Sequence, residues 1–155
     1  MSVFDLPRRR LRRLGTVGLS VAVALTLFSG GPAQAAPGSP SERSMKRYIN
    51  EARVRHHTDR LFLRERLVRI ARSHSRAMAN KGSLFHSSNL GAKMPSGWSI
   101  VGENVGVGSS IESLHDAFMS SPPHRQNNLR PAYEKLGVGV VRRDGRVWIT
   151  VVFYG

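Results

Sequence analysis

The chain contains no cysteine among its 155 residues. This absence excludes disulfide bonds, a cysteine nucleophile and the lipid-bearing cysteine of bacterial lipoproteins. Acidic residues are also scarce, because 10 Asp and Glu stand against 24 Lys and Arg, for a formal net charge of +14. The fold must therefore be held together by its apolar core, and its surface must be strongly cationic.

Signatures of several common enzyme classes are missing as well. The sequence has no Gly-x-Ser-x-Gly elbow, no His-Glu-x-x-His helix and no phosphate-binding glycine loop. Ser87 adjoins the candidate base His86, but side chains adjacent in sequence seldom form a nucleophile–base pair. The sequence therefore argues against a serine hydrolase.

Residues 1–35 have the composition of a secretory signal peptide. They combine an arginine-rich start, an apolar run from Val17 to Phe28 and the small-residue cleavage site Ala33-Gln34-Ala35. A membrane anchor is the alternative, but this run is shorter than the roughly 20 residues that a spanning helix needs. We expect a secreted, extracellular protein, which could associate with the cell wall, and no transmembrane segment after cleavage.

The remaining 120 residues suffice for one domain with one core. Residues 36–44 are rich in proline, glycine and serine, which predicts a flexible tether. We expect the domain to span residues 45–155. Nothing in the sequence indicates an oligomeric state.

The positive charge is concentrated near the start of this domain. Residues 36–155 hold 19 Lys and Arg but 9 Asp and Glu, and 12 of these cations lie between Arg43 and Lys81. Such a surface attracts anionic cell-envelope polymers or lipids, although it could also be a simple solvated surface. Nucleic acid is disfavoured as a partner, because few aromatic residues interleave with the cations.

Periodicity predicts helices first and strands later. We expect helices over residues 44–55, over the apolar stripe from Leu63 to Lys81, and over residues 111–120 after a serine cap. Pro122-Pro123 should end the third helix abruptly and direct His124 from a stiff exit. His74 lies on the second stripe, which favours a hydrogen-bonded core histidine over a ligand.

The sequence pattern of the C-terminal part of the chain has a period of two residues, which is typical of β-strands. Residues 136–141 and 146–154 are expected to be strands joined at Asp144-Gly145, a favoured hairpin turn. Extended chain is also expected near residues 100–101 and 105–107. The fold class predicted by this order of elements is α+β.

Three short polar motifs lie at the ends of expected elements. They are Phe85-His86-Ser87, Gly102-Glu103-Asn104 and the segment Ser121-Pro122-Pro123-His124-Arg125. If the motifs converge, His86, Glu103 and His124 could bind a divalent metal such as zinc, or could act as catalytic acid and base. Asn104, Arg125 and Asn127 are interpreted as structural.

The order of these motifs resembles the CAP superfamily of cysteine-rich secretory, antigen 5 and pathogenesis-related proteins, in its bacterial SCP-like branch. The resemblance covers nearly the whole of residues 45–155. The motifs that carry it are Asn50-x-x-Arg53, Ile70-Ala71-Arg72-Ser73-His74-Ser75, Leu84-Phe85-His86-Ser87, Gly102-Glu103-Asn104-Val105, Ser121-Pro122-x-His124-Arg125-x-Asn127 and Leu136-Gly137-Val138-Gly139-Val140.

The resemblance implies a three-layer α-β-α sandwich with an open cleft that holds two histidines and two glutamates. His86 and Glu103 match the first residue of each kind, and His124 is the match for the second histidine. The Gly-His-Tyr-Thr-Gln motif of eukaryotic members is missing, and Phe118 is followed by Ser121 where many members carry the second glutamate. The full set of four is therefore absent.

Two functions follow from the sequence. The first is a secreted binding module for an envelope component, a lipid, another small apolar ligand or a wall glycan, and the resemblance favours it. The alternative is a metal-assisted or acid–base hydrolase of peptide or cell-wall substrates that uses His86, Glu103 and His124.

Overall fold

The computed structural model describes residues 38–155, so the expected signal peptide and the first two tether residues lie outside it. Its elements are α1 (Pro40–Arg55), β1 (Phe62–Leu63), α2 (Glu65–Lys81), α3 (Leu90–Lys93), β2 (Val101–Gly108), α4 (Ile111–Ser120), α5 (Pro122–Leu129), β3 (Lys135–Arg143) and β4 (Arg146–Tyr154). No helix within this range is long and apolar enough to cross a membrane.

The four strands form one sheet in the order β1-β3-β4-β2. β1 runs parallel to β3, and the other neighbouring pairs are antiparallel. The expected β3–β4 hairpin is confirmed, with Asp144 and Gly145 in the left-handed region at φ 50° and 70°. β2 lies at one edge of the sheet, so one of its sides is free of strand pairing.

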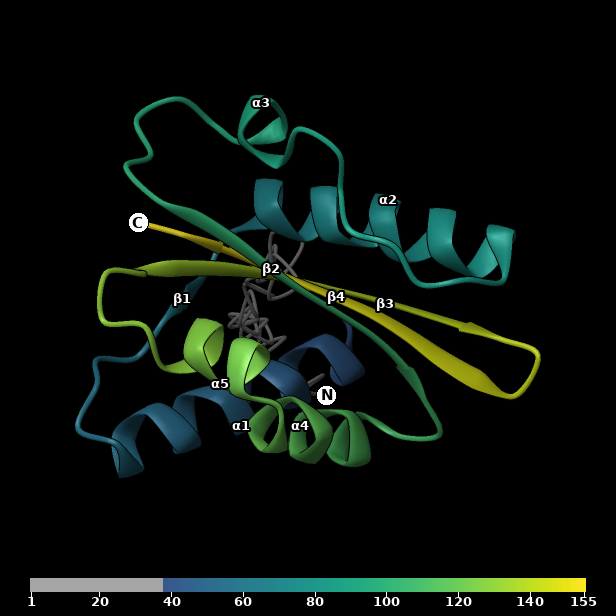
Figure 1. Cartoon of the computed structure of the whole chain (residues 1–155), viewed down its shortest axis with the longest axis horizontal. Coiled ribbons are helices and arrows are strands. Elements are labelled where there is room, and N and C mark those ends of the chain that lie inside the picture. Colours follow the sequence, from purple (N-terminus) through teal and green to yellow (C-terminus); the bar gives the residue numbers. More distant parts are fainter. Residues whose placement is uncertain (1–37) are drawn as a thin grey trace, which may run out of the picture. The chain divides into compact units, whose positions relative to one another are not determined.

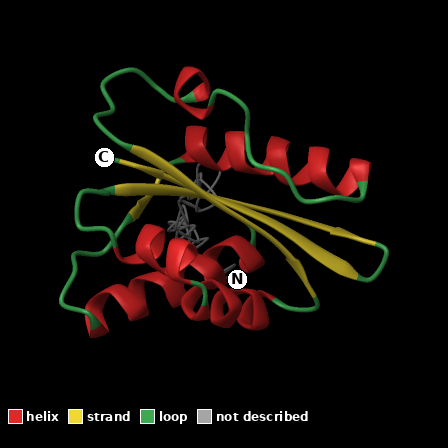
Figure 2. Cartoon of the chain, viewed as in Figure 1, coloured by secondary structure: helices red, strands yellow, loops and turns green. Residues whose placement is uncertain are grey.

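Helices cover both faces of the sheet. Figure 1 and Figure 2 show α2 and α3 on one face and α1, α4 and α5 on the other. This arrangement confirms the predicted α-β-α sandwich. The largest core cluster joins α1, α4 and the central strands, and includes Ile49, Phe118, Val138, Ile149 and Phe153.

α2 packs unusually close to β3. A Cβ atom at Gly137 would lie 2.1 Å from the carbonyl carbon of Leu67, and one at Gly139 would lie 2.1 Å from the backbone nitrogen of Arg72. Glycine is therefore required at both positions by the backbone of the helix. This contact fixes α2 on the sheet and, with it, the position of His74.

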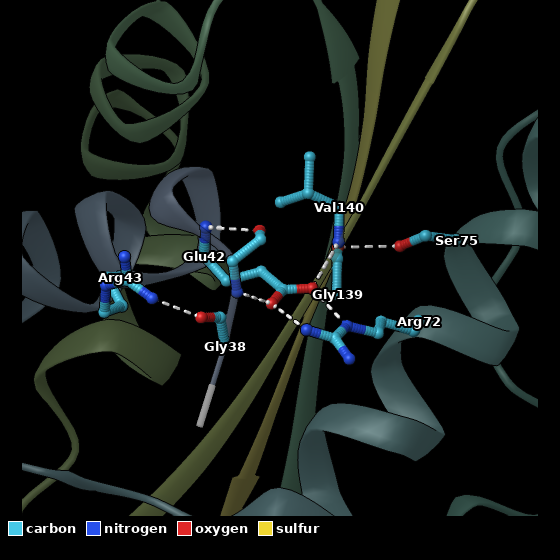
Figure 3. A network of polar contacts seen from close by, with 8 residues as sticks. Gly38, Glu42, Arg43, Arg72, Ser75, Gly139 and Val140 are labelled. Atoms are coloured by element: carbon cyan, nitrogen blue, oxygen red, sulfur yellow. Dashed lines mark hydrogen bonds and ion pairs between the residues drawn. The ribbon is translucent and has the colours of Figure 1, made fainter. Parts of the chain in front are cut away.

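The first helix starts earlier than predicted. Ser39 caps it in a capping box with Glu42, so residues 40–44 are helical and not part of a tether. Glu42 is 1% exposed and binds the guanidinium group of Arg72 through its two oxygens at 2.6 and 2.5 Å. Figure 3 shows this pair beside the backbone of Val140, whose N–H also donates to Glu42. Burial of Glu42 in the domain explains why this segment is ordered.

The two prolines after α4 end that helix as predicted, but they also begin the next one. Ser121 ends α4, and Pro122 and Pro123 begin α5, where a missing N–H costs nothing in the first turn. His124 therefore lies on a helix and not on an irregular exit. The short elements β1 and α3 were not predicted.

Candidate functional site

The edge strand β2 separates the candidate residues by alternation of its side chains. Val105 packs with Met78 of α2, whereas Asn104 donates to Asn128 of α5. Because successive side chains of a strand point to opposite faces, Glu103 shares the α2 side with Val105. The expected trio thus lies around the two sides of one edge strand.

Glu103 is the centre of the α2 side. Its side chain is 5% exposed, and its Oε1 accepts hydrogen bonds from His86 Nδ1 at 2.9 Å and from the Ser87 backbone N–H at 2.8 Å. Its Oε2 is buried without a hydrogen-bond partner within residues 38–155. The carboxylate therefore orients the imidazole of His86, whose side chain is 63% exposed.

His74 also belongs to this group. Its Nε2 donates to the carbonyl oxygen of Phe85 at 2.7 Å, since a carbonyl can only accept, and its ring meets the Phe85 ring edge-on. The prediction of a hydrogen-bonded core histidine is confirmed. The same Nε2 lies 4.0 Å from Glu103 Oε2, a proximity that sequence reasoning missed. Together His74 and Glu103 hold the Phe85–Ser87 segment in place.

His124 lies on the opposite side of β2. Its Nδ1 is 2.8 Å from Ser121 Oγ, and its ring packs against Phe118. Burial lowers the pKa of His124, and the nearby charge of His86 lowers it further. Within the described residues His124 makes no hydrogen bond to Glu103 or His86. The structure therefore brings His86 and Glu103 into contact and places His124 near His86 without direct bonding.

A network of amides ties β2 to α5. Asn104 Nδ2 donates to the carbonyl oxygen of His124 at 3.0 Å, and Asn127 Nδ2 donates to that of Glu103 at 3.2 Å. The two amides are also bonded to each other at 2.9 Å. The structural role predicted for both asparagines is confirmed, and the network sets the position of α5 relative to the edge strand.

A pocket of about 590 Å³ opens between α2 and the segment after it. Its walls are apolar at Ile70, Ala77 and Phe85, and cationic at Arg69 and Lys93. The remaining lining residues are Ser73, His74, His86, Ser87 and Ser88. Ser87 Oγ is buried, so it is not accessible as a nucleophile. The pocket suits a ligand that has both an apolar part and an anionic or hydrogen-bonding group.

The donor atoms do not converge on a common point that would suit a metal. His86 and Glu103 bond to each other, and no group of three His, Cys, Asp or Glu side chains within residues 38–155 is placed to hold an ion. The zinc site expected from the sequence thus gains no support from this geometry.

The family of the chain follows from a match over most of its length. Residues 46–154 match the model of the CAP family, described as the cysteine-rich secretory protein family. The chain belongs to the CAP family. It does so without any cysteine, so the fold of this CAP domain depends on its core and its buried polar contacts.

Solved structures share this CAP fold at low sequence identity. An extracellular protein containing an SCP domain from Bacillus anthracis str. Ames is 23% identical, with a TM-score of 0.66 over 77% of this chain and 45% of its own. An outer surface protein from Borrelia burgdorferi is 17% identical, with a TM-score of 0.65 over 72% of this chain and 90% of its own.

A cysteine-rich secretory protein from Staphylococcus aureus is 22% identical, with a TM-score of 0.63 over 79% of this chain and 40% of its own. This CAP chain thus spans less than half of the Bacillus and Staphylococcus proteins. No curated protein sequence is similar enough to count as a match.

Proposed function

We propose that this CAP domain is a secreted binding module that holds an anionic amphiphile of the cell envelope in the pocket beside α2. The observation that carries the proposal is the composition of the pocket, which joins the apolar surfaces of Ile70 and Phe85 to the cation Lys93 and to Arg69. Arg69 also forms an exposed ion pair with Glu65 at 2.7 Å, a kind of pair that contributes little and that a ligand can replace. Such a site can bury an apolar chain while it neutralises an acidic head group.

The outer face of α2 supports the same proposal. Arg66, Arg69 and Arg76 are exposed there, Arg64 is exposed immediately before the helix, and these cations favour approach to an anionic surface. The two compared proteins described as extracellular and as an outer surface protein suggest a location in which such a ligand is available. Binding to envelope lipids is thus the function that the pocket and the charged surface support together.

The test uses short-chain phosphatidylglycerol, with phosphatidylcholine of equal chain length as the neutral control, in titration calorimetry. Ala77→Trp fills the pocket without a change of charge, and Arg142→Ala with Arg146→Ala removes two exposed cations on the β3–β4 hairpin as a matched control. We expect the pocket variant to bind at least tenfold more weakly and the control variant to bind nearly as the wild type does. Equal binding by wild type and Ala77→Trp would exclude the pocket.

Salt dependence checks the electrostatic part of the proposal. Exposed charges are screened over about 8 Å at physiological ionic strength, so binding to phosphatidylglycerol vesicles should weaken steeply between low and physiological salt. Vesicle binding that does not change with salt would contradict the role of the cationic face.

Acid–base hydrolysis is a second candidate, favoured by the His86–Glu103 contact. Glu103 holds Nδ1 of His86, which leaves Nε2 of an exposed imidazole for proton transfer. Release of soluble fragments from purified cell walls by wild type, and its loss in His86→Ala, which changes an exposed side chain, would support this function. Walls left intact by the wild-type protein would argue against it.

A further inference from the structure

A second concave site lies on the other side of the sheet, where α4 passes into α5. We name it the α5 groove; it has a volume of about 480 Å³ and ends at Pro131. Its apolar surfaces come from Met119, Pro122 and Leu129, and its polar side chains include Arg125, Gln126 and Arg130. Among the described residues, no acidic side chain lines it. It shares no lining residue with the pocket beside α2.

Buried hydrogen bonds hold the backbone at the end of α5, next to the α5 groove. Arg53 is 0% exposed, and its guanidinium group donates to the carbonyl oxygens of Asn128 and Arg130 at 3.0 Å and of Tyr133 at 3.3 Å. Asn128 also donates to the sulfur of Met119 at 3.4 Å. These contacts fix the backbone at the end of α5, so a ligand would meet a shape that is already formed.

The two arginines of the groove carry charge that the domain does not neutralise. Arg125 Nη2 donates to His56 Nε2 at 3.2 Å, and the guanidinium group of Arg130 lies 5.9 Å from the centre of the Tyr133 ring. Within residues 38–155 neither arginine forms an ion pair with a carboxylate. No carboxylate of the described domain therefore neutralises either guanidinium group, and both remain able to bind an anion.

We propose that the α5 groove binds an acidic peptide segment that also carries apolar side chains. Carboxylates would pair with Arg125 and Arg130, which line the groove together with Leu129, and an apolar side chain would cover Leu129 and Met119. A polymer that offers phosphate alone would match the charge but leave this apolar surface exposed. The α5 groove and its ligand are independent of the proposed lipid site.

The test is fluorescence polarisation with the full-length protein and a labelled Glu-Leu-Glu-Leu-Glu-Leu peptide. A Lys-Leu repeat of equal length and inorganic polyphosphate serve as competitors. Gln126→Trp blocks the groove without a change of charge, and Arg125→Ala with Arg130→Ala removes its cations. Arg66→Ala with Arg76→Ala removes two exposed cations from α2 as the matched control.

We expect at least tenfold weaker binding of the acidic peptide to both groove variants and less than a twofold change in the α2 control. The Lys-Leu peptide should not compete, and polyphosphate should compete more weakly than the unlabelled acidic peptide. Three results would each overturn the proposal. They are the absence of saturable peptide binding by wild type, an equal loss of binding in the α2 control, and full binding by Gln126→Trp. Stronger competition by polyphosphate than by the acidic peptide would assign the groove to phosphate polymers instead. Lipid binding is measured separately, so failure of either site is distinguishable from failure of the other.

Discussion

His86 Nδ1 lies 2.9 Å from Oε1 of Glu103, a residue 17 positions further along the chain. The contact joins the segment after α2 to the edge strand β2. The same oxygen also accepts the backbone N–H of Ser87. Glu103 is therefore a structural link between two elements as well as the group that orients an exposed imidazole.

Glu103→Gln should lower stability. The amide keeps one acceptor oxygen but places an NH₂ donor in a buried position 4.0 Å from the donor Nε2 of His74. Since Oε2 already lacks a partner in the wild type, the loss comes from the bonds that Oε1 accepts from His86 and Ser87. Hydrogen bonds to a charged group contribute about 1.5–3 kcal/mol and neutral ones about 0.5–1.5 kcal/mol, so the melting temperature should fall by several degrees in calorimetry. Glu134→Gln, at an exposed carboxylate, is the control and should change little. An unaltered melting temperature for Glu103→Gln would show that this carboxylate does not hold the segment.

Arg72→Ala should destabilise the domain far more than Arg47→Ala. Arg72 pairs with the buried Glu42, whereas the Arg47–Glu51 pair is exposed on both sides. Arg72→Ala leaves the buried carboxylate of Glu42 without its charged partner, which costs about 3 kcal/mol. An exposed pair such as Arg47–Glu51 contributes about 0–1 kcal/mol. Urea unfolding of the two variants measures this difference. Equal midpoints would contradict the structural role of Glu42.

The same pair predicts a loss of stability in acid. Burial acts to raise the pKa of Glu42. The hydrogen bond from Arg72 and those from the Ser39 and Val140 N–H groups together outweigh this effect, so the pKa of Glu42 is lowered. A lowered pKa in the folded state adds stability above the ordinary value near 4.5, and this stability is lost as pH falls below it. The free energy of unfolding in urea should fall less from pH 6 to pH 3 for Arg72→Ala than for wild type.

His115 predicts a second loss of stability at milder pH. Its Nε2 is buried without a partner within the described residues. Burial lowers its pKa, and Arg55 adds to this effect while Asp116 and Glu51 oppose it. The unfolded chain therefore takes up this proton first, so stability is full above about pH 6.5 and falls as pH decreases below that value.

His115→Leu should flatten this decline between pH 7 and pH 5 in urea unfolding. Leucine fills a similar volume beside Tyr48, whose ring packs on the imidazole, and it has no proton to gain. His57→Asn removes an exposed histidine at a φ of 54°, which asparagine tolerates, and serves as the control. If the stability of His115→Leu falls between pH 7 and pH 5 as steeply as that of wild type, groups other than His115 cause the decline.

Gly139→Ala should prevent the normal packing of α2 on the sheet. The added Cβ would lie 2.1 Å from the Arg72 nitrogen and 2.2 Å from the Ala71 carbonyl carbon, and backbone atoms cannot rotate away. Overpacking in a core costs about 1–3 kcal/mol or more. Gly145→Asn lies in open space at a φ of 70°, so it should leave the melting temperature nearly unchanged. A stable Gly139→Ala variant would mean that α2 can shift without loss.

Local chemistry determined much of this fold in advance. Ser110, one of the two serines expected as the cap, caps α4; Gly82 ends α2 at a φ of 70°, and Asp144-Gly145 makes the hairpin turn. Each of these features depends on residues within a few positions of one another, which is why the sequence predicts them. The family motifs likewise pointed to the α-β-α sandwich.

Local sequence patterns were ambiguous where contacts with residues far along the chain determine the secondary structure. Pro122-Pro123 suits the end of one helix and the start of another, and the structure uses both properties. The two-residue strand β1 exists because Phe62 and Leu63 pair with Lys135 and Leu136, which lie far along the chain. The start of α1 depends on Arg72, a distant partner that makes burial of Glu42 favourable.

In the candidate site, too, the sequence predicts some features and the tertiary structure determines the others. The sequence by itself identified His86, Glu103 and His124 as candidates for the site, because they stand in recognisable motifs at the ends of elements. Only the tertiary structure decided that Glu103 contacts His86 and lies near His74, while His124 occupies the other side of β2. The physical reason is the pairing of β2 at the sheet edge, since its register and alternation fix which face each side chain meets.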